Sequence, residues 1–362
     1  MRSVIESKII LGQRISDEEC RYLFSEELPW LGKMATVVKQ RYHADNIATF
    51  LVDININYTN VCICDCDFCA FYVKDGDPSA YVMSTEQILE RVQRLVDIGG
   101  TQVLLQGGVN INLGIDYYTA LFRAIKARFD VYIHSLSPVE IYFLAQKEKK
   151  TVKEILTVLH RAGLDSLPGG GAEILVERVR KQISPKKIPA GMWLSVMRDV
   201  HSIGMEATAT MMFGSVETEA ERVEHLKKIR DLQDETGVFR AFIPWTFQPG
   251  STRLDHVILA GGGEYLKTLA ISRIYLDNIR NFGSGCITEG MKVAELGLLF
   301  GANDMGGILM DEKVLEKTGT ATRTNSEDMK RVIFNAGFVP AKRNTRYEVL
   351  ETYEDNYGRA HA

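Results

Sequence analysis

The chain has no run of about 18 consecutive apolar residues, so its sequence predicts no membrane-spanning helix. It also lacks an excess of one charge sign, since 47 acidic side chains are balanced by 43 basic ones. This balance excludes the strongly basic surface of a protein that coats nucleic acid or docks on a membrane. Glu6 and Lys8 interrupt the first apolar stretch, which therefore cannot be the core of a signal peptide. We expect a cytoplasmic protein with no nucleic-acid partner and no membrane partner.

Internal repeats, low-complexity tracts and interdomain linkers are absent as well. Apolar residues make up 45% of the 362 residues and charged residues 25%, which is ordinary globular composition and excludes a disordered or collagen-like chain. A chain of this length can bury a core that needs no disulfides. Four of its six cysteines nevertheless lie within eight residues, at positions 62, 64, 66 and 69. Clustered thiols in a reducing compartment indicate metal ligands.

Short apolar runs alternate with amphipathic helical patterns from residue 51 onward. Eight runs have the composition or alternation of strands, at residues 51–58, 101–105, 131–134, 164–167, 205–212, 238–244, 278–284 and 299–303. Helices separate them, and one begins with a capping box formed by Ser84 and Gln87. Strands separated by single helices pair in parallel through right-handed crossovers. The pattern predicts an α/β fold, a (β/α)8 TIM-type barrel that is complete or nearly so.

The two ends of the chain are predicted to flank this barrel. Residues 1–47 are expected to form an N-terminal helical cap, with a helix start at residues 16–19, and residues 48–320 the barrel. Residues 321–362 are expected to form a C-terminal extension packed on the barrel. Chemistry in such barrels lies at the C-terminal ends of the strands, which is where the cysteines fall.

Cys62, Cys66 and Cys69 form the pattern C-x3-C-x2-C. Three thiolates on a tight loop can hold three irons of a cubane cluster and leave the fourth iron open to a ligand. The alternatives are a structural zinc site made by all four clustered cysteines and a closed electron-transfer cluster. Zinc motifs normally supply two separated ligand pairs, so the crowding of these sulfurs favours the open cluster.

This motif, with the aromatic residue Phe68 inside it and a strand before it, resembles the radical S-adenosylmethionine (SAM) superfamily. NINYTNVC (55–62), CAFY (69–72) and QGG (106–108) resemble its branch of futalosine-pathway enzymes and deazaflavin FO synthases. The segments most similar to the dehypoxanthine futalosine cyclases of menaquinone biosynthesis are GGGAEIL (169–175), VRKQISPKK (179–187), TATMMFG (208–214), FIPWTFQPG (242–250) and FGANDMG (300–306). The similarity covers about residues 45–345, although Cys64 and the segment 281–286 depart from the family pattern.

The resemblance implies two cofactors, a [4Fe–4S] cluster held by the three cysteines of the motif and SAM bound at its open iron. It also implies a small nucleoside substrate and an external one-electron reductant such as flavodoxin or ferredoxin. In the superfamily, reductive cleavage of SAM yields a 5′-deoxyadenosyl radical that removes a hydrogen atom from the substrate. The cofactors carry the radical chemistry, while the protein positions and shields them.

A first group of SAM-site residues follows from the same resemblance. Phe68 lies within the motif, and Gln106, Gly107 and Gly108 are expected to present a backbone edge to the methionine amino group. The alternative for the glycine pair is an ordinary turn at the end of a strand. Ser137 precedes a proline and is expected either to cap a helix or to contact the ribose.

Glu173 and Arg178 complete the expected SAM site. Glu173 is expected to accept hydrogen bonds from the amino or ribose groups, and Arg178 to pair with the carboxylate through its planar fork. The alternatives are that Glu173 only complements a helix N-terminus and that Arg178 lies on a solvated face. The proton released in the cyclisation needs a base. The candidates for it are His134, Glu289 and Asp304.

Other functions remain open on the sequence alone. Within the same chemistry they are those of aminofutalosine synthase and of the tyrosine-using half of FO synthase. From a different class, the rival is a non-catalytic iron–sulfur electron carrier or sensor. A carrier needs no SAM site, so SAM binding distinguishes the carrier from the enzyme.

Overall fold

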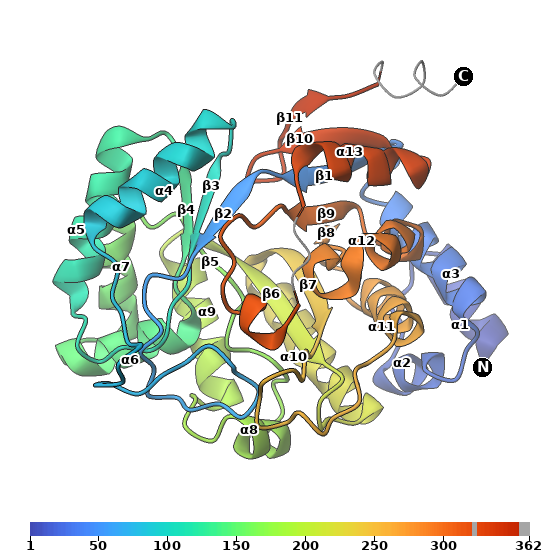
Figure 1. Cartoon of the computed structure of the whole chain (residues 1–362). Coiled ribbons are helices and arrows are strands. Elements are labelled where there is room, and N and C mark those ends of the chain that lie inside the picture. Colours follow the sequence, from blue (N-terminus) through green and yellow to red (C-terminus); the bar gives the residue numbers. More distant parts are fainter. Residues whose placement is uncertain (321–323, 355–362) are drawn as a thin grey trace.

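The computed structural model describes residues 1–320 and 324–354 (Figure 1). Its strands are β1 (Ile47–Leu51), β2 (Asp53–Ile56), β3 (Gln102–Leu105), β4 (Tyr132–Ser135), β5 (Ser166–Leu167), β6 (Glu206–Phe213), β7 (Phe239–Thr246), β8 (Asn281–Phe282), β9 (Asp304–Gly307), β10 (Val339–Arg343) and β11 (Val349–Thr352). Of the expected C-terminal extension, residues 321–323 and 355–362 lie outside the described residues.

The helices are α1 (Arg2–Ile10), α2 (Asp17–Leu23), α3 (Leu28–Gln40), α4 (Thr85–Asp97), α5 (Ile115–Arg128), α6 (Pro138–Glu148), α7 (Val152–Ala162), α8 (Glu177–Ile183), α9 (Ala190–Ser202), α10 (Glu219–Thr236), α11 (Gly262–Tyr275), α12 (Cys286–Gly297) and α13 (Ser326–Asn335), with short 3₁₀ turns η1 (Leu298–Phe300) and η2 (Glu316–Thr318). Helix α4 begins with the expected capping box, because the Ser84 and Gln87 side chains each bond the other's backbone. No helix in the described ranges is both long and apolar enough to cross a bilayer.

Strands β2 to β8 form one parallel sheet in sequence order. A second sheet has the order β11-β10-β1-β9. Single bridges join the two sheets, between Gly283 after β8 and Asp304 in β9, and between Ile54 in β2 and Met310 after β9. The strands therefore curve into a nearly closed ring, and the predicted α/β barrel is confirmed.

The prediction of the eighth strand at residues 299–303 is wrong in its position. Residues 298–300 form η1, and the strand begins only at Asp304. The apolar run packs against helix α3 instead. Phe300 lies so close to Gly32 of α3 that a Cβ on Gly32 would be 3.0 Å from the Phe300 ring. Gly301, with φ of +102°, then turns the chain into β9.

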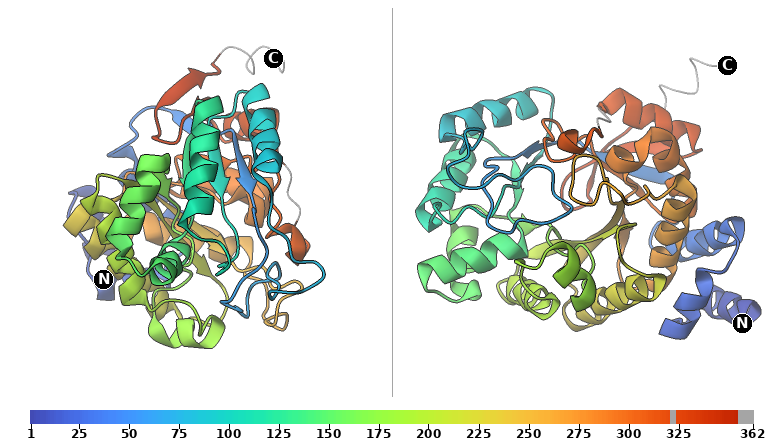
Figure 2. Two further views of the ribbon diagram at one scale, coloured as in Figure 1. Left: turned by 90° about the vertical axis from the view of Figure 1, so that its left-hand side faces the viewer. Right: turned by 60° about the horizontal axis from the view of Figure 1, so that its bottom comes forward.

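The helices form an outer ring around the strands (Figure 2, right). At the end of the barrel that faces the viewer, the blue segment after β2 and the yellow-orange segment after β7 lie together. A backbone hydrogen bond of 2.9 Å from Arg253 to Asp67 joins these segments. This end holds the C-terminal ends of the strands, where barrels of this kind carry their chemistry.

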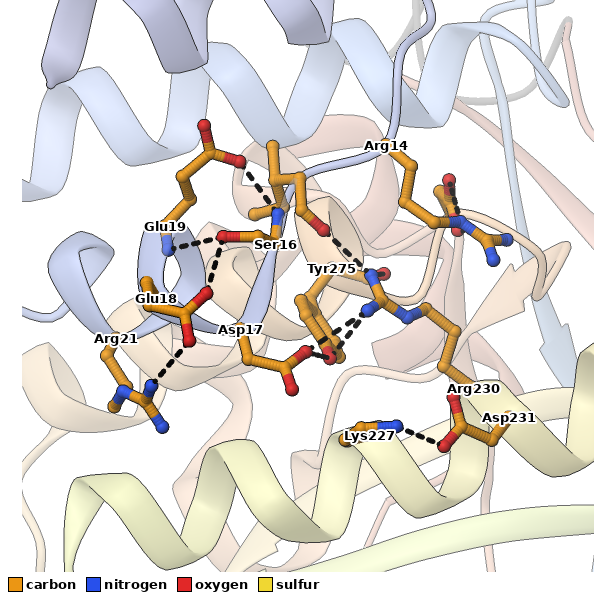
Figure 3. Close-up of polar contacts among 12 residues, drawn as sticks. Arg14, Ser16, Asp17, Glu18, Glu19, Arg21, Lys227, Arg230, Asp231 and Tyr275 are labelled. Atoms are coloured by element: carbon orange, nitrogen blue, oxygen red, sulfur yellow. Dashed lines mark hydrogen bonds and ion pairs between the residues drawn. The ribbon is translucent and has the colours of Figure 1, made fainter.

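The N-terminal helices lie against α10 and α11 outside this ring. Figure 3 shows the buried Arg230 of α10, which donates to the backbone oxygen of Ile15 at 3.1 Å and to the Tyr275 hydroxyl at 2.7 Å. Tyr275 in turn donates to Asp17 at the start of α2. Arg14 adds an ion pair to Asp234. The first helices are thus attached to the barrel through hydrogen bonds and charge as well as through apolar contacts.

Candidate active site

The cysteine loop begins six residues after β2 and is folded by its own backbone. Cys62 N–H donates to the Val73 oxygen at 3.0 Å, and Cys69 N–H donates to the Cys66 oxygen at 3.2 Å. The thiol of Cys66 is buried, and those of Cys62 and Cys69 are partly buried. These bonds hold the three cysteines of the motif on one compact turn.

Two backbone N–H groups point at the sulfur of Cys62. The N–H of Cys64 lies 3.4 Å from this Sγ, and that of Val109 lies 3.3 Å from it. The Cys64 thiol also bonds to this sulfur, and that bond, together with the two N–H groups, lowers the pKa of Cys62 to about 6 although burial opposes the shift. Cys62 is therefore prepared as a thiolate, the form that binds a metal. Cys64 acts as the donor to this ligand.

The turn after β3 packs directly on the cysteine loop. A Cβ on Gly108 would lie 2.2 Å from the Val61 oxygen and 2.8 Å from the Cys62 Cβ. A Cβ on Gly107 would lie 2.8 Å from the ring of Tyr58. A side chain at position 108 would push the cysteine loop away, and one at position 107 would displace the Tyr58 ring. The turn after β3 therefore lies beside the cysteines.

The three thiols of this loop are the kind of ligand that an iron–sulfur cluster takes. No three His, Cys, Asp or Glu side chains within the described ranges come together closely enough to hold one metal ion. A zinc site needs its ligands around a single point. A cubane cluster instead spreads its thiolates over separate irons, so three cysteines on a turn suit it without converging. The donor set of Cys62, Cys66 and Cys69 therefore fits a [4Fe–4S] cluster with one open iron.

A buried ion pair stands beside this donor set. Lys187 Nζ binds the Glu173 carboxylate, and the two side chains are 12% and 8% exposed. The same ammonium lies 4.7 Å from the ring centre of Phe68, within the cysteine motif. Burial opposes the charge on Lys187, but the nearby Cys66 and Glu173 outweigh it and raise the pKa of the lysine. The chain thus places a positive charge beside the clustered cysteines.

Glu173 is positioned by the glycine-rich loop after β5. A Cβ on Gly169 would lie 2.7 Å from the Thr208 oxygen, so this loop lies almost in contact with β6. Thr210 Oγ1 donates to the Gly169 oxygen at 2.8 Å. Glu173 itself has φ of +40°, a left-handed conformation that is uncommon for a side chain of its size and is held here by the surrounding structure.

A cavity of about 380 Å³ fills the barrel interior. Glu173 and Gln106 lie in its wall beyond the C-terminal ends of the strands. Asp53 and Arg240 line it near the starts of β2 and β7, and His134 lines it within β4. Its remaining wall combines aliphatic and aromatic side chains with many polar ones, including Asn55, Thr288 and Thr345.

Three side-chain oxygens in this wall have no hydrogen-bond partner among the described residues. The side-chain oxygens of Asn55, Thr288 and Thr345 are buried and form no hydrogen bond within the part of the chain described. A buried polar atom without a partner is costly, so such atoms indicate a bound polar ligand or water. The cavity suits a ligand that combines a flat apolar group with several hydroxyl groups.

The structure brings four of the predicted site residues to this cavity and leaves others outside its wall. Gln106, His134, Glu173 and Asp304 line it. Ser137 is the N-cap of α6, where its hydroxyl accepts the N–H of Glu140 at 3.3 Å.

Glu289 and Arg178 do not line the cavity. The carboxylate of Glu289 accepts the N–H and hydroxyl of Thr246. Arg178 lies on the outer surface with half of its side chain exposed, and it binds Glu221 through two hydrogen bonds of 2.6 Å.

Sequence reasoning missed Asp53 and Lys187. Lys187 ends the basic segment SPKK, which is typical of a solvated surface, and its burial depends on two loops that meet only in the fold. Asp53 stands in the alternating run DININ, where its inward direction is predictable but its burial is not.

Two family models match this chain. The radical SAM superfamily model covers residues 56–229, and the model of the CofH/MqnC C-terminal region covers residues 236–356. The cyclic dehypoxanthine futalosine synthase of Halalkalibacterium halodurans is 43% identical over 353 residues, which are 97% of this chain and 95% of that protein. The chain belongs to the radical SAM superfamily. Within this superfamily, its relatives are enzymes of the CofH/MqnC group, which favours an enzyme over an electron carrier.

Other relatives and solved structures agree. A cyclic dehypoxanthine futalosine synthase of Streptomyces coelicolor is also 43% identical, over 95% of this chain and 88% of that protein. The 5-amino-6-(D-ribitylamino)uracil–L-tyrosine 4-hydroxyphenyl transferase of Methanothermobacter thermautotrophicus is 38% identical, over 94% of this chain and 96% of that protein. The crystal structure of methylornithine synthase superposes with a TM-score of 0.74 at 19% identity, over 93% of this chain and 97% of that chain. The likeness to that structure concerns the fold alone.

Proposed function

We propose that the chain is a radical SAM cyclase that converts dehypoxanthine futalosine into cyclic dehypoxanthine futalosine, a step of menaquinone biosynthesis. The observation that carries this proposal is the 43% identity over nearly the whole chain to two synthases of that name. The transferases of the same group are less similar, at 38% identity or below. We place the reaction in the cytoplasm, with a flavodoxin or ferredoxin as electron donor.

Cys62, Cys66 and Cys69 would hold the [4Fe–4S] cluster, and SAM would bind beside it. When bound, these cofactors supply a 5′-deoxyadenosyl radical that removes a hydrogen atom from the substrate. We infer that Lys187 pairs with the SAM carboxylate, since it is the buried cation beside the cysteines. Arg178, which faces solvent and is bound to Glu221, is less suited to this task. The Glu173 carboxylate would accept hydrogen bonds from the SAM amino group.

The barrel cavity would hold the nucleoside. Its unpartnered oxygens on Asn55, Thr288 and Thr345 suit ribose hydroxyls, and Trp245 in its wall suits an aromatic ring. Hydrogen abstraction from the ribose would leave a carbon radical, which adds to the benzoate ring. Loss of one electron and one proton then restores aromaticity and gives the spirocyclic product. The enclosing barrel keeps water and stray hydrogen donors away from these intermediates.

The test is anaerobic turnover with dehypoxanthine futalosine that carries deuterium on the ribose. A cyclase transfers one deuterium to 5′-deoxyadenosine, and its other product has lost two hydrogens in total. Mass spectrometry of both products measures this directly. If the deuterium stays in the nucleoside, the cyclase assignment fails.

A parallel incubation with tyrosine and 5-amino-6-(D-ribitylamino)uracil tests the transferase activity of the 38% identical relatives. We expect no SAM consumption in this arm. SAM consumption driven by tyrosine would replace the cyclase by a transferase and leave the superfamily assignment unchanged. A substrate that takes up the adenosyl group would instead indicate aminofutalosine synthase chemistry.

A further inference from the structure

Two carboxylates, Asp53 and Asp304, stand close together in the wall of the barrel cavity, and they have different partners. Asp304 is bound by the guanidinium of Arg343, through bonds of 2.5 and 2.8 Å to its two oxygens. The Thr49 hydroxyl and the Gly306 N–H also donate to it, at 2.6 and 2.9 Å. Asp304 is therefore held in a buried ion pair with Arg343.

Asp53 has only neutral partners. Its carboxylate accepts the Leu309 N–H at 2.9 Å and the Gln102 side-chain amide at 3.3 Å. The backbone covers it so closely that a Cβ on Gly307 would lie 2.2 Å from its oxygen. This carboxylate is 2% exposed, and no cation forms an ion pair with it among the described residues.

Burial raises the pKa of Asp53 to about 7. The Leu309 N–H, the charge of Arg343 and the Gln102 amide oppose this shift, while the charge of Asp304 adds to it. Another titratable neighbour is the buried thiol of Cys286, whose own pKa is raised by burial and by both carboxylates. Asp53 thus lines the cavity with two neutral hydrogen-bond partners and a raised pKa, which are properties that suit a general base.

The geometry of His134 excludes it from this role. Arg240 lies 3.1 Å from Nδ1 of the imidazole, and a guanidinium can only donate, so Nδ1 is the acceptor. The ring proton is then on Nε2, and burial, together with Arg240 and Arg343, holds the pKa of His134 well below its ordinary value. His134 is a neutral donor, and its acceptor nitrogen is already occupied.

The other cavity carboxylates are more strongly bound. Glu173 pairs with Lys187. Glu312 accepts three donors, the N–H groups of Val314 and Leu315 and the side-chain amide of Asn55. Burial raises the pKa of Glu312 as well, so this residue is the rival that an experiment must separate from Asp53.

We propose that Asp53 is the base that takes the proton from the substrate ring when the cyclised radical regains aromaticity. This role rests on the cyclase function proposed above. In that step the bond between the ribose carbon and the ring carbon has formed, and the ring C–H bond breaks. Its proton goes to the Asp53 carboxylate, and one electron goes to an acceptor of the iron–sulfur class. Together with the hydrogen atom carried off in 5′-deoxyadenosine, this accounts for the two hydrogens lost.

The test compares Asp53→Asn with the wild-type protein in anaerobic single turnovers with the ribose-deuterated substrate. We expect deuterated 5′-deoxyadenosine to form in both proteins. The cyclised product per 5′-deoxyadenosine should fall about a hundredfold in the variant, as the loss of a general base predicts. In the wild type this ratio should rise with pH through about 7, because only ionised Asp53 accepts a proton, and the variant should lose this dependence. Iron content and SAM affinity should not change.

Two matched variants complete the design. Glu312→Gln tests the rival base and should keep the pH midpoint of the ratio. Asp199→Asn, on α9 outside the cavity, controls for the chemical change and should leave the ratio as it is. An unchanged ratio in Asp53→Asn, or the same loss in Glu312→Gln alone, overturns the role of Asp53.

Two further outcomes keep the test decisive. If Asp53→Asn is not recovered as a folded, iron-containing protein, Gln102→Met replaces it, because removal of the amide donor should move the pH midpoint upward. An unmoved midpoint then overturns the proposal. If the wild type itself forms no deuterated 5′-deoxyadenosine, the cyclase function fails, and the role of Asp53 fails with it.

Discussion

Lys187 pairs with Glu173 in an enclosed space between the cysteine loop and the glycine-rich loop after β5. Neither partner lies on a strand, since Glu173 lies in the loop before α8 and Lys187 in the loop after it. The Lys187 ammonium also contacts the ring of Phe68 in the cysteine motif. A buried ion pair of this kind contributes little to stability, since desolvation offsets much of the attraction. Its position instead suits recognition of a zwitterionic ligand, whose amino and carboxylate groups can exchange partners with the pair.

Lys187→Met should weaken SAM binding about ten- to hundredfold, because a charge-assisted hydrogen bond contributes about 1.5–3 kcal/mol. Iron content after reconstitution should be retained, since the thiolates are unchanged. Arg178→Ala is the matched control, which removes a surface cation and should leave SAM affinity as it is. Equilibrium binding to the reduced protein measures both variants. If Arg178→Ala weakened SAM binding and Lys187→Met did not, Arg178 would be the residue that pairs with the SAM carboxylate.

Each of Cys62→Ala, Cys66→Ala and Cys69→Ala should lose the [4Fe–4S] cluster and SAM cleavage. The wild type should take up about four irons per chain, as expected for one cluster. Iron analysis and the electron paramagnetic resonance spectrum of the reduced protein report the loss. Full SAM cleavage in any one of these three variants would contradict the assigned ligands.

Cys64→Ala should keep the cluster and most of the activity. Its thiol donates to the sulfur of Cys62 rather than taking a position of its own among the ligands. Hydrogen bonds to cluster sulfurs tune the reduction potential, and removal of a donor makes the cluster harder to reduce. A potentiometric titration should therefore show a lower potential in the variant. Loss of iron would make Cys64 a ligand.

Gly108→Ala should prevent proper assembly of the cluster, because its methyl group would lie 2.2 Å from the Val61 oxygen and 2.8 Å from the Cys62 Cβ. We expect iron content to fall well below that of the wild type. Gly191→Ala is the matched control, since this glycine lies in α9 and nothing is within 4 Å of the added methyl group. That change should stabilise the protein by about 0.5–1 kcal/mol, the usual gain of alanine over glycine in a helix.

Stability should fall as the pH drops below about 6.5, in part because of His225. This side chain is fully buried, its Nδ1 accepts the Leu175 N–H at 3.0 Å, and burial lowers its pKa to about 3. The unfolded chain takes up a proton near pH 6.5 while the folded one does not, so stability is lost at about 1.4 kcal/mol per pH unit below that value. His225→Asn keeps an acceptor without titrating. Denaturation of the iron-free protein at a series of pH values should show a shallower slope for the variant.

The strand runs of the barrel were predictable because parallel strands are buried on both faces and are apolar throughout. The predicted run at 205–212 and the observed β6 at Glu206–Phe213 differ by one residue at each end. The strand predicted at 299–303 was wrong because the apolar residue Phe300 packs on α3, and such packing is possible in a helical turn as well as in a strand. Strand β1 was not predicted. Its partners β9 and β10 come from the other end of the chain, so no neighbouring strand–helix pattern in the sequence indicates it.

The candidate site was predictable where chemistry follows from local spacing, as in the cysteine motif and the glycine turn that covers it. It was not predictable where distant segments meet. The solvent-facing position of Arg178 depends on Glu221, forty-three residues later. Asp53 has only neutral hydrogen-bond partners because Arg343 binds Asp304 instead. Such pairings cannot be predicted without the fold, because the sequence contains several residues of suitable charge that could pair with each of these side chains.

The pairing of β1 with β9 and β10 has a consequence for the order of events during synthesis on the ribosome. Strand β1 is made within the first 51 residues, but its hydrogen-bonding partners at 304–307 and 339–343 emerge only when most of the chain has left the exit tunnel. Its edges remain unpaired until then, and an unpaired strand edge can join another chain. A nascent chain halted after residue 303 should therefore depend on a chaperone, whereas one that includes residue 343 can close the ring by itself.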